Sequence, residues 1–220
     1  CEFKPSPMHS HSSFLSRRRF LVRTGGMLAA STWVRAELRP ADANGHVVGE
    51  PVVEGIGAKI LADGGNAVDA LIATALAGAV TQPHQTGIGG YASHGMFAMA
   101  GGKRIAALDG NTLAPSAFTK DIFKPDAKGQ VPDRKNEHGW LAAGVPGVIG
   151  ALKLALDEFG TMSFADVLQP AIKLTRDGFP LSTVVAARIA ASKASFSRDE
   201  GPMRLYFPGG EPPKAGSLFK

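Results

Sequence analysis

The chain has 220 residues, of which 44% are hydrophobic and 20% charged, a balance typical of a globular protein able to bury one sizeable core. Its formal net charge of +5 arises within residues 1–40, where seven Lys and Arg residues stand against two Glu residues, so the rest is neutral. This distribution excludes a basic nucleic-acid-binding face. The single cysteine, Cys1, excludes an internal disulfide and a cysteine-based metal site.

The N-terminal segment has the pattern of an export signal. Residues 16–21 read SRRRFL, which matches the twin-arginine pattern, and a weakly apolar run follows from Val22 to Val34. We therefore predict a signal within residues 8–37 and a periplasmic or secreted protein; the alternative is a basic, disordered tail. The run is too short and too broken for a stable membrane span. Residues 1–7 are interpreted as preceding the natural start at Met8.

Two helices are predicted next, over Glu50–Ala62 and Ala67–Val80, joined as a tight helical hairpin at Gly64–Gly65. Asn66 is a favourable N-cap for the second helix, and Asp69 places a negative charge in its first turn. Because this helix carries almost no other charge, we expect it to be buried on most sides. It is predicted to be the central helix of a layered α/β domain, packed against the sheet that follows.

A glycine-rich turn, Gln82–Gly90, leads into two predicted strands, Met96–Ala100 and Arg104–Asp109. The turn has two interpretations: a concavity of backbone N–H groups facing an anion or a cleft, or a close-packed turn that feeds the first strand, which we favour. His84 and His94 have no partner at metal-ligand spacing and are interpreted as structural or surface histidines.

The remaining chain is predicted to alternate loops and helices. Residues 125–138 form a loop, and helices span 146–159, 163–177 and 184–191, with the chain loop-like after Ser195. Ser163 and Asp166 form a capping box, and Pro170 bends the second of these helices. The predicted buried side chains are Val148, Ile149, Leu152 and Leu156 in the first helix, and Val167, Leu168, Ile172 and Leu174 in the second.

No self-contained active site is recognisable in the sequence. It lacks a G-x-S-x-G elbow, an H-E-x-x-H motif, a phosphate-binding Walker loop and a paired-cysteine zinc pattern. The carboxylates Asp63, Asp69, Asp157 and Glu158 sit at helix ends, where solvation or capping accounts for them. No cofactor or metal is therefore predicted.

Four stretches in register resemble the N-terminal half of the γ-glutamyltransferases. They are GGNAVDA (64–70), QPHQTGIGG (82–90), ALDGNTLAPSAF (107–118) and AAGVPGVIGALKLALDEFGTMSFADVLQPAIKLTRDGFPLS (142–182). The likeness runs from about Gly45 to Gly216, and we predict an incomplete large-subunit domain over 45–220. It implies an α/β (α+β) fold, the αββα sandwich of the N-terminal-nucleophile hydrolases, with only its N-terminal part present.

The resemblance also implies a chemistry. Such enzymes cleave themselves, and a new N-terminal threonine of the C-terminal subunit attacks an amide such as glutathione, with γ-glutamyl hydrolysis or transfer as the result. That threonine corresponds to a position beyond Lys220, so the resemblance implies no catalytic residue in this chain. It also implies that the fragment is inactive by itself, and that its partner is the C-terminal, small-subunit half of the same precursor.

The family's substrate-binding arginine lies between an Ala-Leu-Asp strand and an Ala-Pro pair. Here that place is taken by Asn111, which with Thr112 is predicted to bind substrate. Asparagine cannot make the bidentate, charged pair of arginine, a loss of about 2 to 5 kcal/mol for a carboxylate ligand. Strand alternation places Arg104 on the opposite face from Asp109, so Arg104 is not a replacement. The alternatives are a related amide acylase with a non-γ-glutamyl donor, or a truncated, non-catalytic interaction protein.

Overall fold

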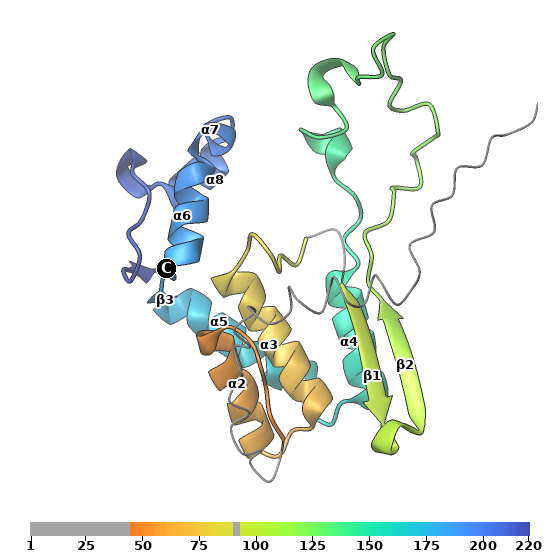
Figure 1. Ribbon diagram of the computed structural model, residues 1–220, viewed down its shortest axis with the longest axis vertical. Helices are drawn as coiled ribbons and strands as arrows, with labels where there is room; N and C mark the ends of the chain where they lie inside the picture. Colours follow the sequence, from red (N-terminus) through yellow and green to blue (C-terminus); the bar gives the residue numbers. More distant parts are fainter. Residues whose placement is uncertain (1–44, 90–92) are drawn as a thin grey trace, which may run out of the picture. The chain divides into compact units, whose positions relative to one another are not determined.

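The computed structural model describes residues 45–89 and 93–220, all within one compact unit, Ala41–Lys220 (Figure 1). Cys1 and the signal predicted within residues 8–37 lie outside the described residues. In chain order the elements are α2 (Pro51–Ala62), α3 (Ala67–Thr81), β1 (His94–Met99), β2 (Arg104–Asp109), α4 (Val148–Phe159), α5 (Phe164–Asp177), β3 (Phe179–Pro180), α6 (Thr183–Ala191), α7 (Lys193–Phe196), α8 (Glu200–Tyr206) and β4 (Leu218–Phe219).

The predicted helical hairpin is confirmed in α2 and α3. The Glu50 side chain caps α2 by accepting a hydrogen bond from the backbone N–H of Val52 at 3.2 Å, with Pro51 in the first turn. Gly64 takes a positive φ of 96° at the connection, a conformation that favours glycine. The two helices pack against each other along their length.

Helix α3 lies at the centre of the main core, as its charge-free sequence predicts. Ile72, Ala73 and Ala77 on it are fully buried. Its main neighbours, however, are α2 and α5. The sheet reaches the same core through Phe97 of β1, which is buried in it, and through the partly buried Met99 and Leu108. Helix α4 contacts both α3 and β2 and lies between them (Figure 1).

The strands β1 and β2 form the predicted antiparallel hairpin. His94 pairs with Asp109 at one end, and Met99 pairs with Arg104 at the other. Gly101 and Gly102 have positive φ values of 66° and 85° in the turn between them. The sheet is therefore a two-stranded ribbon in the described part of the chain.

Helices α4 and α5 complete the main core. Val148, Leu152 and Leu156 of α4 are buried as predicted, but Ile149 is 38% exposed and the prediction for it is wrong, since the small Ala151 and Ala155 occupy the inner face instead. Helix α5 buries Val167 and Ala171 fully. The other side chains predicted as buried on α5 are half-buried: Leu168, Ile172 and Leu174.

The cap predicted for α5 forms with altered geometry. The Ser163 hydroxyl oxygen accepts from the Asp166 backbone N–H at 3.1 Å. The Asp166 carboxylate accepts in return from the Ser163 hydroxyl at 2.6 Å. The helix then continues through Pro170 to Asp177.

A buried carboxylate ties the α2–α3 connection to the α4–α5 connection. Asp69 is 0% exposed, and its oxygens accept from the backbone N–H groups of Asn66 (2.7 Å), Thr161 (2.9 Å) and Met162 (3.1 Å) and from the Thr161 hydroxyl (2.6 Å). The Asn66 side-chain amide donates to the Phe159 carbonyl oxygen at 2.7 Å. Asp69 therefore caps α3 as predicted, but solvation plays no part, and it also joins segments 92 residues apart.

The chain after Ser195 is not the predicted loop. Helix α7 spans this point and α8 follows it, with the Asp199 side chain capping α8 by accepting from the Gly201 backbone N–H at 3.1 Å. Both helices are short, and glycine and proline in the first turn of α8 hide its helical pattern from the sequence. Aromatic packing holds the region together, with Phe196 and Tyr206 rings 5.3 Å apart beside the buried Phe207.

Residues 125–138 are irregular, as predicted, apart from one 3₁₀ turn at Pro132–Arg134. Among the helices of residues 45–89 and 93–220, none is both long enough and apolar enough to cross a membrane.

Candidate functional site

The segment that follows β2, Gly110–Leu113, is held by backbone hydrogen bonds on both sides. The buried Gly110 donates its N–H to the Ser93 carbonyl oxygen at 2.7 Å, just before β1 begins. Leu113 and Val145 form an isolated antiparallel bridge, with N···O distances of 3.1 and 2.9 Å. The predicted substrate-binding residues Asn111 and Thr112 lie between these two anchors.

Side chains brace the turn that contains Asn111. An oxygen of the Asp109 carboxylate accepts from the Asn111 backbone N–H at 3.0 Å, and the same oxygen lies 3.4 Å from Nδ1 of His94. The Asn111 side-chain oxygen accepts from the Thr112 backbone N–H at 3.1 Å. Asn111 is exposed and Thr112 half-buried. His94, interpreted as a structural or surface residue, is exposed and partners Asp109.

Two glycines of the AAGVPGVIG stretch make room for this segment. A Cβ placed at Gly144 would lie 2.2 Å from Cγ2 of Thr112, and one at Gly147 would lie 2.4 Å from the Asn111 carbonyl oxygen. Such contacts are too short for any side chain. The sequence reasoning missed the positioning roles of Gly144, Gly147 and Ser93, and the Gly-Val-Pro-Gly spacing was the signal that pointed to the first two.

Arg104 lies at the opposite end of the hairpin from Asp109 and Asn111, because it pairs with Met99 in the register. Its guanidinium stands over the Phe159 ring, 5.0 Å from the centroid. The arginine therefore joins the hairpin to α4, away from the Asn111 turn.

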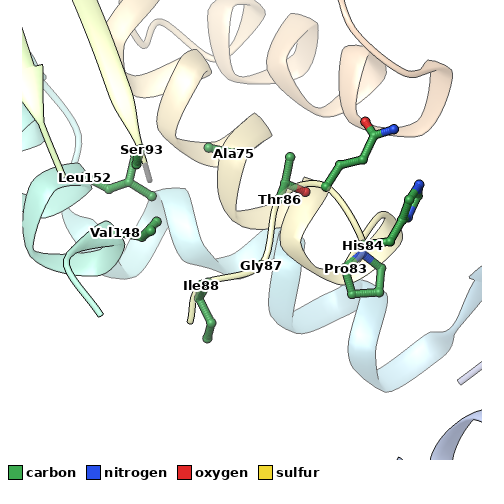
Figure 2. A pocket seen from close by; sticks show the side chains of 10 residues that line it. Ala75, Pro83, His84, Thr86, Gly87, Ile88, Ser93, Val148 and Leu152 are labelled. Carbon is green, nitrogen blue, oxygen red and sulfur yellow. The ribbon is translucent and has the colours of Figure 1, made fainter. Parts of the chain in front are cut away.

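A cavity of about 470 Å³ lies between α3, α4 and the Pro83–Ile88 segment (Figure 2). Figure 2 shows Val148 and Leu152 on one side, the Thr86–Ile88 segment across from them, and Ala75 of α3 between. The full lining is Ala75, Pro83, His84, Gln85, Thr86, Gly87, Ile88, Ser93, Val148 and Leu152. Asn111 and Thr112 are not part of it, but Ser93 links it to Gly110.

The described part of the glycine-rich turn, Gln82–Gly89, has features of both interpretations, because it packs on α3 and its Pro83–Ile88 segment also lines the cavity. The backbone N–H groups of Gln85 and Thr86 both donate to the Gln82 carbonyl oxygen, at 2.9 and 3.0 Å, so they are not presented to an anion. The turn packs on α3, where a Cβ at Gly78 would lie 3.2 Å from the Thr86 hydroxyl oxygen.

The other cavities do not adjoin the Asn111 turn. One of about 590 Å³ lies along α2 and α5 and has charged side chains such as Lys59, Asp63 and Arg176 in its lining. Another of about 110 Å³ lies between the Pro83–His84 segment and α6 with Tyr206. Within the described residues, no group of three or more His, Cys, Asp or Glu side chains is placed to hold a metal ion.

The family identity follows from comparison with known proteins. The sequence model described as Gamma-glutamyltranspeptidase matches residues 54–220. The chain belongs to the gamma-glutamyltranspeptidase family. The resemblance expected from the four sequence stretches is thus confirmed.

Curated relatives with two different names are equally similar in sequence to this chain. The glutathione hydrolase proenzyme of Escherichia coli (strain K12) is 37% identical over 167 residues, covering 74% of this chain and 28% of the relative. The Acylase ACY 1 proenzyme of Pseudomonas sp. (strain V22) is 37% identical over 188 residues, covering 82% and 33%. The chain therefore spans about a third or less of the curated relatives it matches.

Solved structures confirm the mixed α/β fold. Gamma-glutamyltranspeptidase from Helicobacter pylori has a TM-score of 0.75 at 32% identity, covering 82% of this chain and 52% of that one. A cephalosporin acylase from Bacillus halodurans has a TM-score of 0.67 at 27% identity, covering 84% and 36%. The described helices and the β1–β2 hairpin thus form part of the fold of this enzyme family.

Proposed function

We propose that this chain is the large-subunit part of an exported enzyme that hydrolyses an amide or transfers its acyl group. The observation that carries the proposal is the family match over residues 54–220. We propose that the substrate-binding position predicted from the sequence motifs is the braced turn that contains Asn111. In the proposed reaction a threonine hydroxyl attacks the amide carbonyl, the C–N bond breaks as the amine leaves with the proton, and water hydrolyses the resulting ester.

The threonine belongs, in this proposal, to the small subunit released by self-cleavage of the precursor. Names that include the word proenzyme among the relatives, together with the share of their length that the chain spans, support this division of labour. The large subunit by itself is then inactive, and its contribution is to position the donor. The SRRRFL motif supports export to the periplasm or beyond.

Asn111 favours a donor other than a γ-glutamyl amide as the second candidate. Asn111 is exposed just after β2. Its neutral amide can donate a hydrogen bond to a carboxylate, but it cannot form the charged, bidentate pair that arginine forms. The acylase relatives, as similar in sequence as the glutathione hydrolases, support the same conclusion. We therefore propose that the enzyme discriminates weakly in favour of a donor carboxylate.

The test uses the complete protein encoded by the reading frame that contains this chain. Three p-nitroanilides share a leaving group: the γ-glutamyl amide, the glutaryl amide without the amino group, and the 4-aminobutanoyl amide without the carboxylate. We expect turnover, with kcat/KM for the γ-glutamyl and 4-aminobutanoyl amides within about tenfold, a gap of about 1.4 kcal/mol. If the protein releases no acyl group from any of these amides, the proposed enzymatic activity is contradicted and the alternative, a non-catalytic interaction protein, is favoured.

Asn111→Arg tests the assignment of this position. It should raise the preference for the γ-glutamyl over the 4-aminobutanoyl amide by about 30-fold or more, corresponding to about 2 kcal/mol or more of carboxylate binding. Asn136→Arg, in the exposed loop 125–138, adds the same charge elsewhere and should leave the preference unchanged. Equal effects of the two substitutions would contradict a binding role for Asn111.

A further inference from the structure

The cavity between α3 and α4 has the walls of a site for an uncharged chain. Its apolar lining residues are Ala75, Pro83, Ile88, Val148 and Leu152, and the polar residues Gln85, Thr86 and Ser93 in the lining are uncharged. Among the residues that line it, His84 is the single titratable one, and that side chain is exposed at the far side of the turn (Figure 2). An ionised ligand group entering it would lose water without gaining a charged partner, whereas an aliphatic chain would gain from burial.

Two of the lining residues, Ser93 and Val148, connect the cavity to the Asn111 turn, the first through a hydrogen bond and the second through the chain. Ser93 lines the cavity, and its carbonyl oxygen accepts from Gly110, the residue before Asn111. Val148 lines it on the other side and directly follows Gly147, whose Cα lies against the Asn111 carbonyl oxygen. Ser93 and Val148 are therefore the lining residues that connect the cavity to the Asn111 turn.

The size of the space also matches a small ligand. At about 470 Å³, the cavity falls in the range of about 300 to 1,000 Å³ that holds small molecules in other proteins. The larger cavity along α2 and α5 has a charged rim and does not adjoin Asn111.

We propose that this cavity binds the aliphatic acyl chain of the donor amide, with the scissile carbonyl left near the Asn111 turn. The inference rests on the proposed acyl transfer and names its substrate class: amides of uncharged, medium-length carboxylic acids. It explains why the position that holds a charged arginine in the family is neutral here, since such a donor has no distal carboxylate to bind.

The experiment compares acetyl, butanoyl and hexanoyl p-nitroanilides with the complete protein. We expect kcat/KM to rise from acetyl to hexanoyl by at least tenfold. Ala75→Leu fills the cavity from the half-buried face of α3 and should lower the hexanoyl-to-acetyl ratio at least tenfold. Val148→Ala enlarges the cavity and should shift the preference toward longer chains. Ala58→Leu, on the exposed side of α2, is the matched control and should leave the ratio as it is.

A binding measurement separates this inference from the proposed reaction. Hexanoate, but not acetate, should raise the thermal midpoint of the protein, and Ala75→Leu should abolish the effect. Hexanoate binding without turnover of any amide would contradict the proposed enzymatic activity and would support the acyl-chain site in the cavity. If the enzyme turns over these amides but neither Ala75→Leu nor Val148→Ala changes the hexanoyl-to-acetyl ratio of kcat/KM, the acyl-chain site in the cavity is contradicted and the proposed enzymatic activity is supported.

Discussion

Asp69→Asn tests the buried carboxylate that joins the two helix connections. Asp69 is 0% exposed and accepts four hydrogen bonds, so replacing one oxygen with an NH₂ group turns an acceptor into a donor facing other donors. The Thr161 hydroxyl can reverse and accept, but a backbone N–H is left unpaired and the surviving bonds lose their charge. We expect a loss of about 2 to 4 kcal/mol in unfolding free energy.

The comparison is with Asp63→Asn, three residues before the N-cap residue Asn66. The Asp63 carboxylate is 47% exposed and pairs with Lys59 at 2.9 Å on the surface of α2. Such pairs contribute about 1 kcal/mol or less. Urea denaturation of the purified variants, and amide hydrogen exchange at Thr161 and Met162, measure the global and local effects. Equal midpoints for the two variants, or unchanged exchange at these two amides, would refute the structural role of Asp69.

The loss of stability caused by Asp69→Asn should depend on pH, and the pKa of Asp69 sets the direction of that dependence. Burial disfavours the charged form of Asp69, but its hydrogen bonds to Thr161, Asn66 and Met162 outweigh that effect and lower its pKa below the ordinary value. A carboxyl with a lowered folded-state pKa stabilises the fold above its unfolded pKa of about 4 and loses that contribution as pH falls through the folded value. The difference in stability between wild type and Asp69→Asn should therefore be full at neutral pH and shrink below about pH 4.

Two further substitution pairs test the packing around the site. Gly147→Ala, at the N-cap of α4, should destabilise the protein by about 1 kcal/mol or more because its Cβ would overlap a backbone carbonyl. Gly150→Ala, inside α4, meets nothing within 4 Å and should stabilise the protein by about 0.5 to 1 kcal/mol; thermal denaturation distinguishes the two variants. Arg104→Ala should cost about 0.5 to 1 kcal/mol through the lost contact with the Phe159 ring, and Lys103→Ala next to it should cost less; a double-mutant cycle with Phe159→Leu checks that the ring is the cause.

The elements that were predictable from the sequence carry their signals locally. Helix α3 has its cap at Asn66 and an almost charge-free body, and the β1–β2 hairpin has its glycine pair, so short windows suffice. Helix α8 escaped prediction because seven residues that include Gly201 and Pro202 have no clear period, and its support comes from the Phe196 and Tyr206 rings. A local sequence pattern cannot predict a helix that is stabilised mainly by tertiary contacts.

The same distinction applies to the candidate site. The Ala-Leu-Asp and Ala-Pro motifs located Asn111, but not what holds it, because Ser93 and Gly147 reach it from distant parts of the chain. The partners of Asp69 were equally out of reach of a local pattern, since Thr161 lies 92 residues away. Sequence windows identify a motif's residues, whereas the contacts that position them become visible only in three dimensions.

Backbone contacts fix the position of residue 111 independently of the side chain that it carries. The hydrogen bond from Gly110 to Ser93 and the Leu113–Val145 bridge hold the turn through backbone atoms. The Asp109 carboxylate also accepts a hydrogen bond from the backbone N–H of residue 111, which does not depend on the side chain there. The exposed Asn111 side chain adds only its bond to Thr112. Asn111→Arg should therefore change the unfolding free energy by about 0.5 kcal/mol or less while changing donor preference. A loss well above 1 kcal/mol in urea denaturation would show that the asparagine side chain holds the turn, and that the scaffold does not accept charged and neutral residues alike.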